Sequence, residues 1–231
     1  MTKAEIYTFV TNLLDGFEID TTLFDTFLNT AQSYWENQRP WMALRAEDSS
    51  NTISPGNTFT TVHTLPTNFR KWYTRFPIVL ADSQQNPQQY LREVPFNSKL
   101  AYKSDGTRFY CDYANRRFYI CGEVPQALTA YLYFIKKGTL VSADDNNEWE
   151  LDTLDEYTEI LGLTVAVYWK NGVDYDVINN AQANANASLA GQIFKSMTEW
   201  DGELQESAIQ GQDYGSDAGW LGNASGGRIQ F

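Results

Sequence analysis

The chain is short of the residues on which most catalytic and metal sites depend. Its 231 residues include one histidine and two cysteines, too few for a zinc site of the usual histidine and cysteine ligands. It has no Gly-x-Ser-x-Gly, P-loop or Gly-x-Gly-x-x-Gly motif, which removes support for the enzyme classes built on them. No apolar run approaches the roughly 18 residues of a membrane span, and no leader is recognisable. We therefore expect a soluble protein that is not exported.

The composition is that of a folded, acidic protein. Hydrophobic residues make up 42% of the chain and aromatic residues 15%, enough for a core, so intrinsic disorder is excluded. The 17 basic and 29 acidic side chains give a net charge of −12. Such a charge repels nucleic acid and anionic lipid, so a surface that grips either over its whole extent is also excluded. The length indicates one large domain or one domain with an insertion.

The few candidate reactive residues favour structural roles. Cys111 and Cys121 stand ten residues apart in an expected strand pair, where they are either reduced, half-buried thiols or close enough to bridge. His63 lies in an alternating, threonine-rich run and is expected on a sheet surface.

An acidic cluster at residues 144–148 has part of a calcium-loop pattern. With Asp144, Asn146 and Glu148 at positions one, three and five, position six should be glycine, but it is Trp149. The match fails, and a solvated loop before a helix is the interpretation we adopt.

One-sided apolar stripes predict two helices at the start of the chain. Thr2 and Glu5 have capping-box spacing, and apolar residues follow at helical spacing until Gly16. Asp20 or Thr21 can cap a second helix that Pro40 closes. The short connection favours an antiparallel pair, with a helical turn near residues 41–44 plugging its end.

Between about residues 51 and 138 the apolar period becomes that of strands. Strands are expected at residues 58–65, 72–80, 107–113, 118–121 and 128–135, with a hairpin tip at 115–116 and a short helix at 96–103. No crossover helix fits between them, so we expect a small antiparallel sheet.

Helical spacing then returns. Residues 153–156 form a second capping-box pattern before a stripe that ends at Gly172. Asp174 or Asp176 can start a long helix whose stripe runs from Ile178 to Leu204, about 40 Å. Alanine at every second position from 181 to 187 gives this helix a thin face, suited to close packing within one subunit or between subunits.

These patterns predict an α+β fold, namely an antiparallel helix bundle with an inserted small antiparallel β-module and an extended C-terminal arm. The expected domains are residues 1–50 for the N-terminal helices of the bundle, 51–138 for the β-module, 139–209 for the C-terminal helices and 210–231 for the arm. The arm has six glycines and few apolar residues. Ordering such a segment costs about 1–2 kcal/mol per residue, which a partner would have to offset.

Charge follows the same division of the chain. Residues 39–137 carry 13 basic and 7 acidic side chains, whereas the flanks carry 4 basic and 22 acidic. Helices that lie against DNA would not be this acidic. Helices that line a channel for passing DNA could be, because a repulsive wall prevents sticking while the basic module faces another protein.

The order of these features resembles a known family. Two amphipathic helices end in an aromatic segment that runs from Tyr34 to Arg45, and a strand closes in Leu65-Pro66-Thr67-Asn68-Phe69-Arg70-Lys71. A small sheet, an acidic entry to the helix at residues 156–170 and a long last helix follow. This order resembles the head-to-tail adaptor proteins of tailed bacteriophages, also called head-completion or tail tubular proteins. The Leu-Pro-x-x-Phe-Arg segment is its most specific local feature.

The resemblance implies a structural protein of the virion, assembled in the host bacterial cytoplasm. It implies a homo-oligomeric ring of about twelve copies docked under the portal protein, with a channel through which double-stranded DNA passes towards a downstream tail or nozzle protein during genome ejection. No membrane contact is expected. Because the family's role is structural, we expect no enzyme activity, no catalytic residue, no metal and no cofactor.

The resemblance also implies that the C-terminal arm reaches into the portal. On this arm we expect portal binding by large, widely spaced side chains, since aromatic residues and arginine most often carry binding energy. These residues are Tyr214, Trp220, Leu221, Arg228, Ile229 and Phe231.

A second hypothesis comes from a different class of protein. An aromatic-rich, tail-associated module could bind glycans or degrade cell walls, using paired carboxylates such as Glu148 with Glu150 or Glu203 with Glu206. In a chain with 29 acidic residues such pairs arise by chance. The discriminating feature would be an aromatic-lined pocket that holds a desolvated carboxylate.

Overall fold

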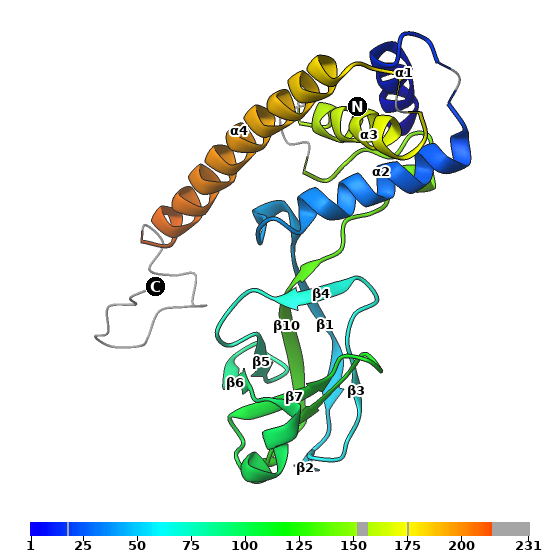
Figure 1. Cartoon of the computed structure of the whole chain (residues 1–231). Helices are drawn as coiled ribbons and strands as arrows, with labels where there is room; N and C mark the ends of the chain where they lie inside the picture. The colour runs from blue at the N-terminus through cyan, green and yellow to red at the C-terminus, as the bar shows by residue number, and fades with distance from the viewer. Residues whose placement is uncertain (18, 152–156, 175, 214–231) are drawn as a thin grey trace. The chain divides into compact units, whose positions relative to one another are not determined.

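The chain divides into two compact units. The computed structural model describes residues 1–17, 19–151, 157–174 and 176–213, with side chains as far as Gln205 (Figure 1). One unit comprises residues 1–31 and 152–231, and the other comprises residues 32–151. We call them the helical unit and the β unit.

Four helices are described: α1 (Lys3–Leu13), α2 (Thr21–Glu36), α3 (Glu159–Gly172) and α4 (Asn180–Asp213). The capping box at Thr2 and Glu5 is confirmed, because each side chain accepts a hydrogen bond from the other's backbone N–H. Asp20 caps α2, since its carboxylate accepts the Leu23 N–H at 2.8 Å. The last five residues of α2 belong to the β unit.

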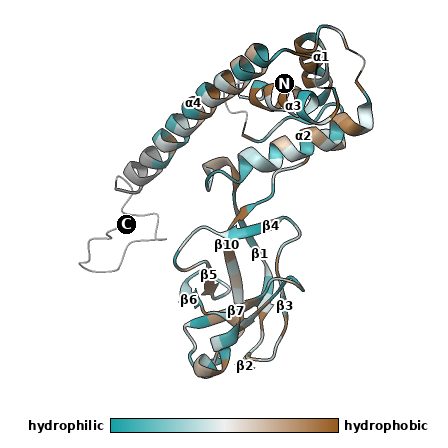
Figure 2. Ribbon diagram, in the orientation of Figure 1, coloured by the Kyte–Doolittle hydropathy of each residue, from teal (hydrophilic) through white to brown (hydrophobic). Residues whose placement is uncertain are grey.

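Apolar contacts hold the helical unit together. The helix α3 packs against α1 and α4, and it buries eight of its residues. Gly162 lets α1 approach, because a Cβ atom there would stand 2.5 Å from the Phe9 ring. Phe27 of α2 meets the Trp169 ring edge to face, with centroids 5.7 Å apart. The helix α4 is less apolar than α3 (Figure 2).

The start predicted for the long helix is wrong. The Asp174 carboxylate instead accepts the Asp176 N–H at 3.0 Å and so closes a local turn. Asn179 takes the capping position, where its side chain accepts the Gln182 N–H at 2.8 Å. At its other end α4 continues to Asp213. The capping pattern predicted at residues 153–156 lies outside the described residues.

The β unit is built around a large sheet. Its strands are β1 (Arg45–Ile53), β2 (Gly56–Asn57), β3 (His63–Thr64), β4 (Phe69–Trp72), β5 (Ile78–Ala81), β6 (Pro87–Glu93), β7 (Arg108–Asp112), β8 (Arg117–Ile120), β9 (Glu123–Val124) and β10 (Leu128–Lys136). Three short 3-10 helices are η1 (Met42–Leu44), η2 (Phe96–Tyr102) and η3 (Val141–Ala143).

Eight strands form one sheet in the order β1-β10-β5-β6-β7-β8-β3, with β4 also paired to β10, while β2 and β9 form a separate pair. All pairs are antiparallel except β6 with β7. The parallel pair is possible because residues 94–107, including η2, make the crossover. One cluster of buried apolar side chains fills the sheet's core, drawn from β1, β5 to β8, β10 and the segments beside them.

The predicted antiparallel helix bundle with a small β-module is therefore wrong. The β unit is an eight-stranded sheet with one parallel pair, and the helices are few. The two longest strands that escaped prediction are polar: β1 pairs at the edge of the sheet, and β6 reads Pro-Gln-Gln-Tyr-Leu-Arg-Glu. The strand expected at residues 58–65 is confirmed only at His63 and Thr64, which form β3, and is wrong at its start. Thr58 turns the chain there, its hydroxyl donating to the Ile120 carbonyl at 3.0 Å.

Both cysteines are buried, free thiols. Of the two alternatives, reduced thiols or a bridge, the structure has the reduced thiols. The β7–β8 register places Cys111 opposite Phe118, and the Cys121 N–H bonds to the Arg108 carbonyl. The two residues therefore do not face each other. Burial raises the pKa of the Cys121 thiol to about 11 and that of Cys111 further.

Candidate interaction site at the Leu65–Arg70 turn

The segment that carries the family resemblance folds as an ordered turn. The Leu65 N–H bonds to the Arg116 carbonyl at 3.0 Å, and the Arg116 guanidinium donates back to the Pro66 carbonyl. Phe69 closes the turn onto the same Pro66 carbonyl, and the Lys137 N–H bonds to the Asn68 carbonyl at 2.6 Å. The turn is thus held by the β7–β8 hairpin and by the end of β10.

The one aromatic residue of the turn, Phe69, packs against the core of the sheet. Phe69 contacts three rings, those of Trp72, Tyr113 and Phe134, with centroids 4.6, 6.1 and 5.6 Å away. Trp72 also meets Phe109 at 5.5 Å, edge to face. The phenylalanine of the motif therefore anchors the turn to the core of the β unit.

Its arginine holds the end of α2. Arg70 donates to the Glu36 backbone carbonyl at 2.9 Å and to the Glu36 carboxylate at 3.0 Å. The Trp149 indole and the Gly138 N–H donate to the same carboxylate at 3.2 and 3.3 Å. Because Glu36 is only 3% exposed, these donors replace the water that its charge has lost.

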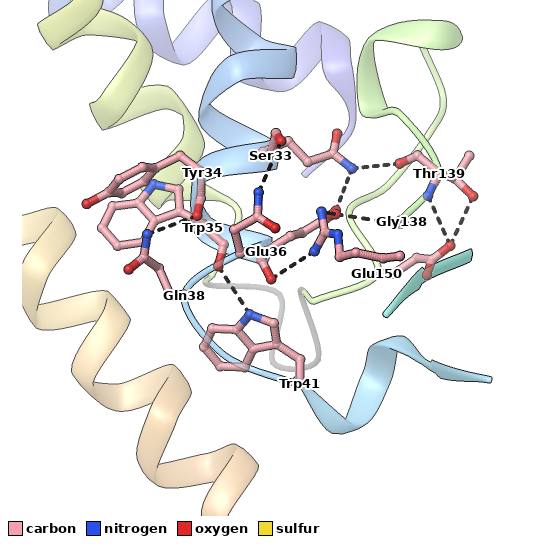
Figure 3. A network of polar contacts seen from close by, with 12 residues as sticks. Ser33, Tyr34, Trp35, Glu36, Gln38, Trp41, Gly138, Thr139 and Glu150 are labelled. Atoms are coloured by element: carbon pink, nitrogen blue, oxygen red, sulfur yellow. Dashed lines mark hydrogen bonds and ion pairs between the residues drawn. The ribbon is translucent and has the colours of Figure 1, made fainter. Parts of the chain in front are cut away.

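Figure 3 shows how this network continues around Gly138 and Thr139. Gln32, one turn before Glu36, donates to the Glu36 carboxylate and to the Thr139 carbonyl, both at 2.8 Å, and accepts the Val141 N–H at 3.0 Å. Gly138 leaves no room for a side chain, since a Cβ atom would stand 2.3 Å from the Glu36 carboxylate. We call Gln32, Glu36, Arg70, Gly138 and Trp149 the Glu36 network.

A second carboxylate completes the outer side of this region. Glu150 accepts from the Thr139 hydroxyl at 2.9 Å and pairs with Lys136 at 2.8 Å. Burial works against its charge, but the bonds from Lys136 and Thr139 outweigh that effect and lower the pKa of Glu150. Glu150, proposed above as one of a catalytic pair, is thus engaged in an ion pair.

A pocket of about 770 Å³ opens beside the turn. Four cations line it, namely Arg70, Lys71, Arg116 and Lys137, against one acid, Glu93. Its remaining walls include three aromatic rings, those of Phe69, Trp72 and Tyr113. The Tyr113 hydroxyl donates to Glu93 at 2.5 Å, and burial, with the nearby Cys111 and Glu93, raises the pKa of Tyr113. The pocket is therefore basic and aromatic.

The other candidate residues lie elsewhere. His63 is buried on β3 against Phe118, with ring centroids 5.1 Å apart, and burial lowers its pKa. Among the described residues no three histidine, cysteine or acidic side chains gather as a metal site would require. In the same part of the chain no helix has the length and apolarity to cross a membrane. The residues expected to bind the portal, Tyr214, Trp220, Leu221, Arg228, Ile229 and Phe231, all lie outside the described residues.

Sequence reasoning found Arg70 but missed its partners in the Glu36 network. A signal existed. Phe24 and Leu28 lie four residues apart on the buried face of α2, and Gln32 and Glu36 continue the same row. Polar residues at apolar positions of a helical stripe indicate a buried polar contact.

A comparison with known families matches residues 1–213 to the model described as SU10 adaptor protein. The chain belongs to this family. The resemblance to phage head-to-tail adaptors is thereby confirmed, and the adaptor family is a structural component of bacteriophages with a head–tail connector role. A search of curated proteins found no match. The family match spans both units and ends with α4, so residues 214–231 lie beyond it.

Proposed function

We propose that this adaptor is a ring-forming subunit of the virion's head-to-tail connector. About twelve copies would dock under the portal protein, join it to a downstream tail or nozzle protein and let double-stranded DNA pass during ejection. The observation that carries this proposal is the family match over residues 1–213, because it covers the helical unit and the β unit together.

The charge of the two units supports a channel role. The helical unit carries 17 acidic and 4 basic residues, whereas the β unit carries 12 acidic and 13 basic. An acidic wall repels DNA and keeps it from sticking as it passes. We therefore propose that acidic helices face the channel, while the basic part of the β unit faces protein neighbours.

The residues beyond α4 are proposed as the portal anchor. Glycine-rich sequence can follow a crevice of another protein, and the large residues between the glycines can fill its pockets. This assignment rests on sequence alone, since the family match stops at residue 213. A chain ending after Asp213 should keep both units and lose attachment to the portal.

The test uses the full chain, the chain ending after Asp213 and the portal protein of the same phage. Mass photometry and electron microscopy would follow each chain with and without portal. We expect rings of the full chain on the portal and none of the shortened chain. A full chain that stays a monomer with portal present would contradict the connector function, and full-strength binding of the shortened chain would contradict only the anchor.

A further inference from the structure

Only some of the positively charged side chains that line the pocket beside the Leu65–Arg70 turn are paired with a carboxylate. Arg70 is neutralised by Glu36. Lys71, Arg116 and Lys137 are exposed, and no carboxylate pairs with any of them among the residues that the structure describes. Glu93 is bound by Tyr113. Three cations therefore face a concavity that holds one acid, Glu93, so the pocket keeps a net positive charge.

The chemistry of the walls defines what would fit. Carboxylates would neutralise the lysines and the arginine, and an aromatic ring would pack against Phe69, Trp72 and Tyr113. A volume of about 770 Å³ is within the range of ligand pockets, large enough for a few side chains. The complementary ligand is a short acidic segment that presents an aromatic ring.

The turn between α1 and α2 has this chemistry. Phe17 is 38% exposed, and Asp15 and Asp20 flank it. Among the exposed large apolar side chains of the described residues, it is the one aromatic ring with an acidic residue within three positions on each side.

Backbone hydrogen bonds hold the Asp15–Phe17 part of this connection in place. Asp15 and Gly16 adopt positive φ angles of 54° and 79°. The Gly16 N–H bonds to the Thr11 carbonyl at 2.9 Å, and the Phe17 N–H bonds to the Leu14 carbonyl at 3.0 Å. The exposed ring is therefore presented on an ordered turn, which reduces the entropy lost on binding.

We propose that the pocket of one copy binds the Asp15–Phe17 turn of a second copy, with Phe17 against the aromatic walls and Asp15 and Asp20 against Lys71, Arg116 and Lys137. This inference rests on the proposed function, since it names a contact through which copies associate. The pocket and the turn are different surfaces of the chain. The contact is therefore heterologous, and such a contact repeats from copy to copy until a ring closes.

Two variants would disable the pocket and the turn separately. The pocket variant is Lys71→Glu with Lys137→Glu. The turn variant is Asp15→Asn, Phe17→Ser and Asp20→Asn, because asparagine tolerates a positive φ and keeps the helix cap. The control, Arg75→Glu with Lys103→Glu, makes the same charge change at exposed residues that do not line the pocket. Circular dichroism and thermal melting would verify folding.

Sedimentation velocity and mass photometry would measure association of the full-length chains at one fixed salt concentration, on their own and on portal. We expect each half-disabled variant to lose about tenfold or more in association, as hot-spot residues do, and the control to match the wild type. An equal mixture of the two variants should form dimers and stop there, because only one working pocket and one working turn can meet.

Other results overturn the inference in distinguishable ways. If both variants assemble as the wild type does, or their mixture forms no dimer, the pairing is wrong while the connector function stands. If the wild type never self-associates, even on portal, both fail. If the pocket variant assembles normally but loses binding to a short DNA duplex, which the control retains, the pocket binds phosphate and not the turn.

Discussion

The two ends of α2 are held in opposite ways. In the helical unit its first turns bury Phe24 and Leu28, and Phe27 packs on Trp169. In the β unit its last turns bury Gln32 and Glu36, and hydrogen bonds hold them. Apolar packing depends on volume and tolerates compensating changes. A buried charge depends on every donor being present, so the β-unit end should be the more easily broken.

The largest effect should come from Glu36→Ala. The substitution removes the carboxylate that accepts from the Arg70 guanidinium, the Trp149 indole and the Gly138 N–H, and we expect a loss of about 3–5 kcal/mol in the free energy of unfolding. Urea unfolding would measure it, with Glu123→Ala at an exposed position as the matched control. A loss no larger than the control's would mean that the Glu36 network does not stabilise the protein.

Two glycine substitutions compare an apolar contact of the helical unit with the polar Glu36 network of the β unit. Gly162→Ala forces a methyl group onto Phe9, and Gly138→Ala forces one onto the Glu36 carboxylate; each should cost about 1–3 kcal/mol in unfolding free energy. Phe9→Leu should partly restore the first by freeing volume. No smaller side chain at residue 36 should restore the second, because the carboxylate itself is needed.

Gly191→Ala is the matched control for these substitutions. Nothing lies within 4 Å of the position that its Cβ would take, in the interior of α4. The substitution should therefore raise helix stability by about 0.5–1 kcal/mol. Thermal melting that showed Gly162→Ala to be equally stabilising would contradict the close α1–α3 approach.

Mild acid should weaken the β unit through His63. The one histidine of the chain is His63, and burial lowers its pKa below 6.5. The fold therefore binds the proton less well than the unfolded chain, so stability is complete above pH 6.5 and falls as the pH drops towards the folded pKa. The slope cannot exceed about 1.4 kcal/mol per pH unit for one proton. Urea unfolding between pH 7.5 and 5.5 should show this slope in the wild type and not in His63→Gln. If the His63→Gln variant kept the same slope, groups other than His63 would be responsible for the loss of stability.

The same contrast explains what could be predicted from the sequence. The caps at Thr2 and Asp20 and the hairpin strands β7, β8 and β10 follow local rules of spacing and periodicity. The strands β1 and β6 did not, because their polar residues alternate too weakly with apolar ones to indicate a strand, and the partner of β1, which is β10, lies far away in sequence. Because these two strands were missed, the sequence predicted a fold dominated by helices, whereas the structure has an eight-stranded sheet.

The candidate site shows the same limit. Leu65 to Arg70 stood out in the sequence, but its role depends on Glu36, Gly138 and Arg116, which approach it only in the folded chain. The pocket could not be predicted either, since its cations come from three separate segments. Hydrogen-bond partners distant in sequence leave no periodic signal.

A cryo-electron microscopy reconstruction of the full chain bound to its portal would test the connector function and the channel wall together. We expect a closed ring whose lumen is lined by acidic side chains of the helical unit. Isolated copies without a ring would contradict the connector function. A ring whose lumen is net basic, lined by Arg116, Arg117, Lys136 and Lys137, would contradict the proposed channel wall.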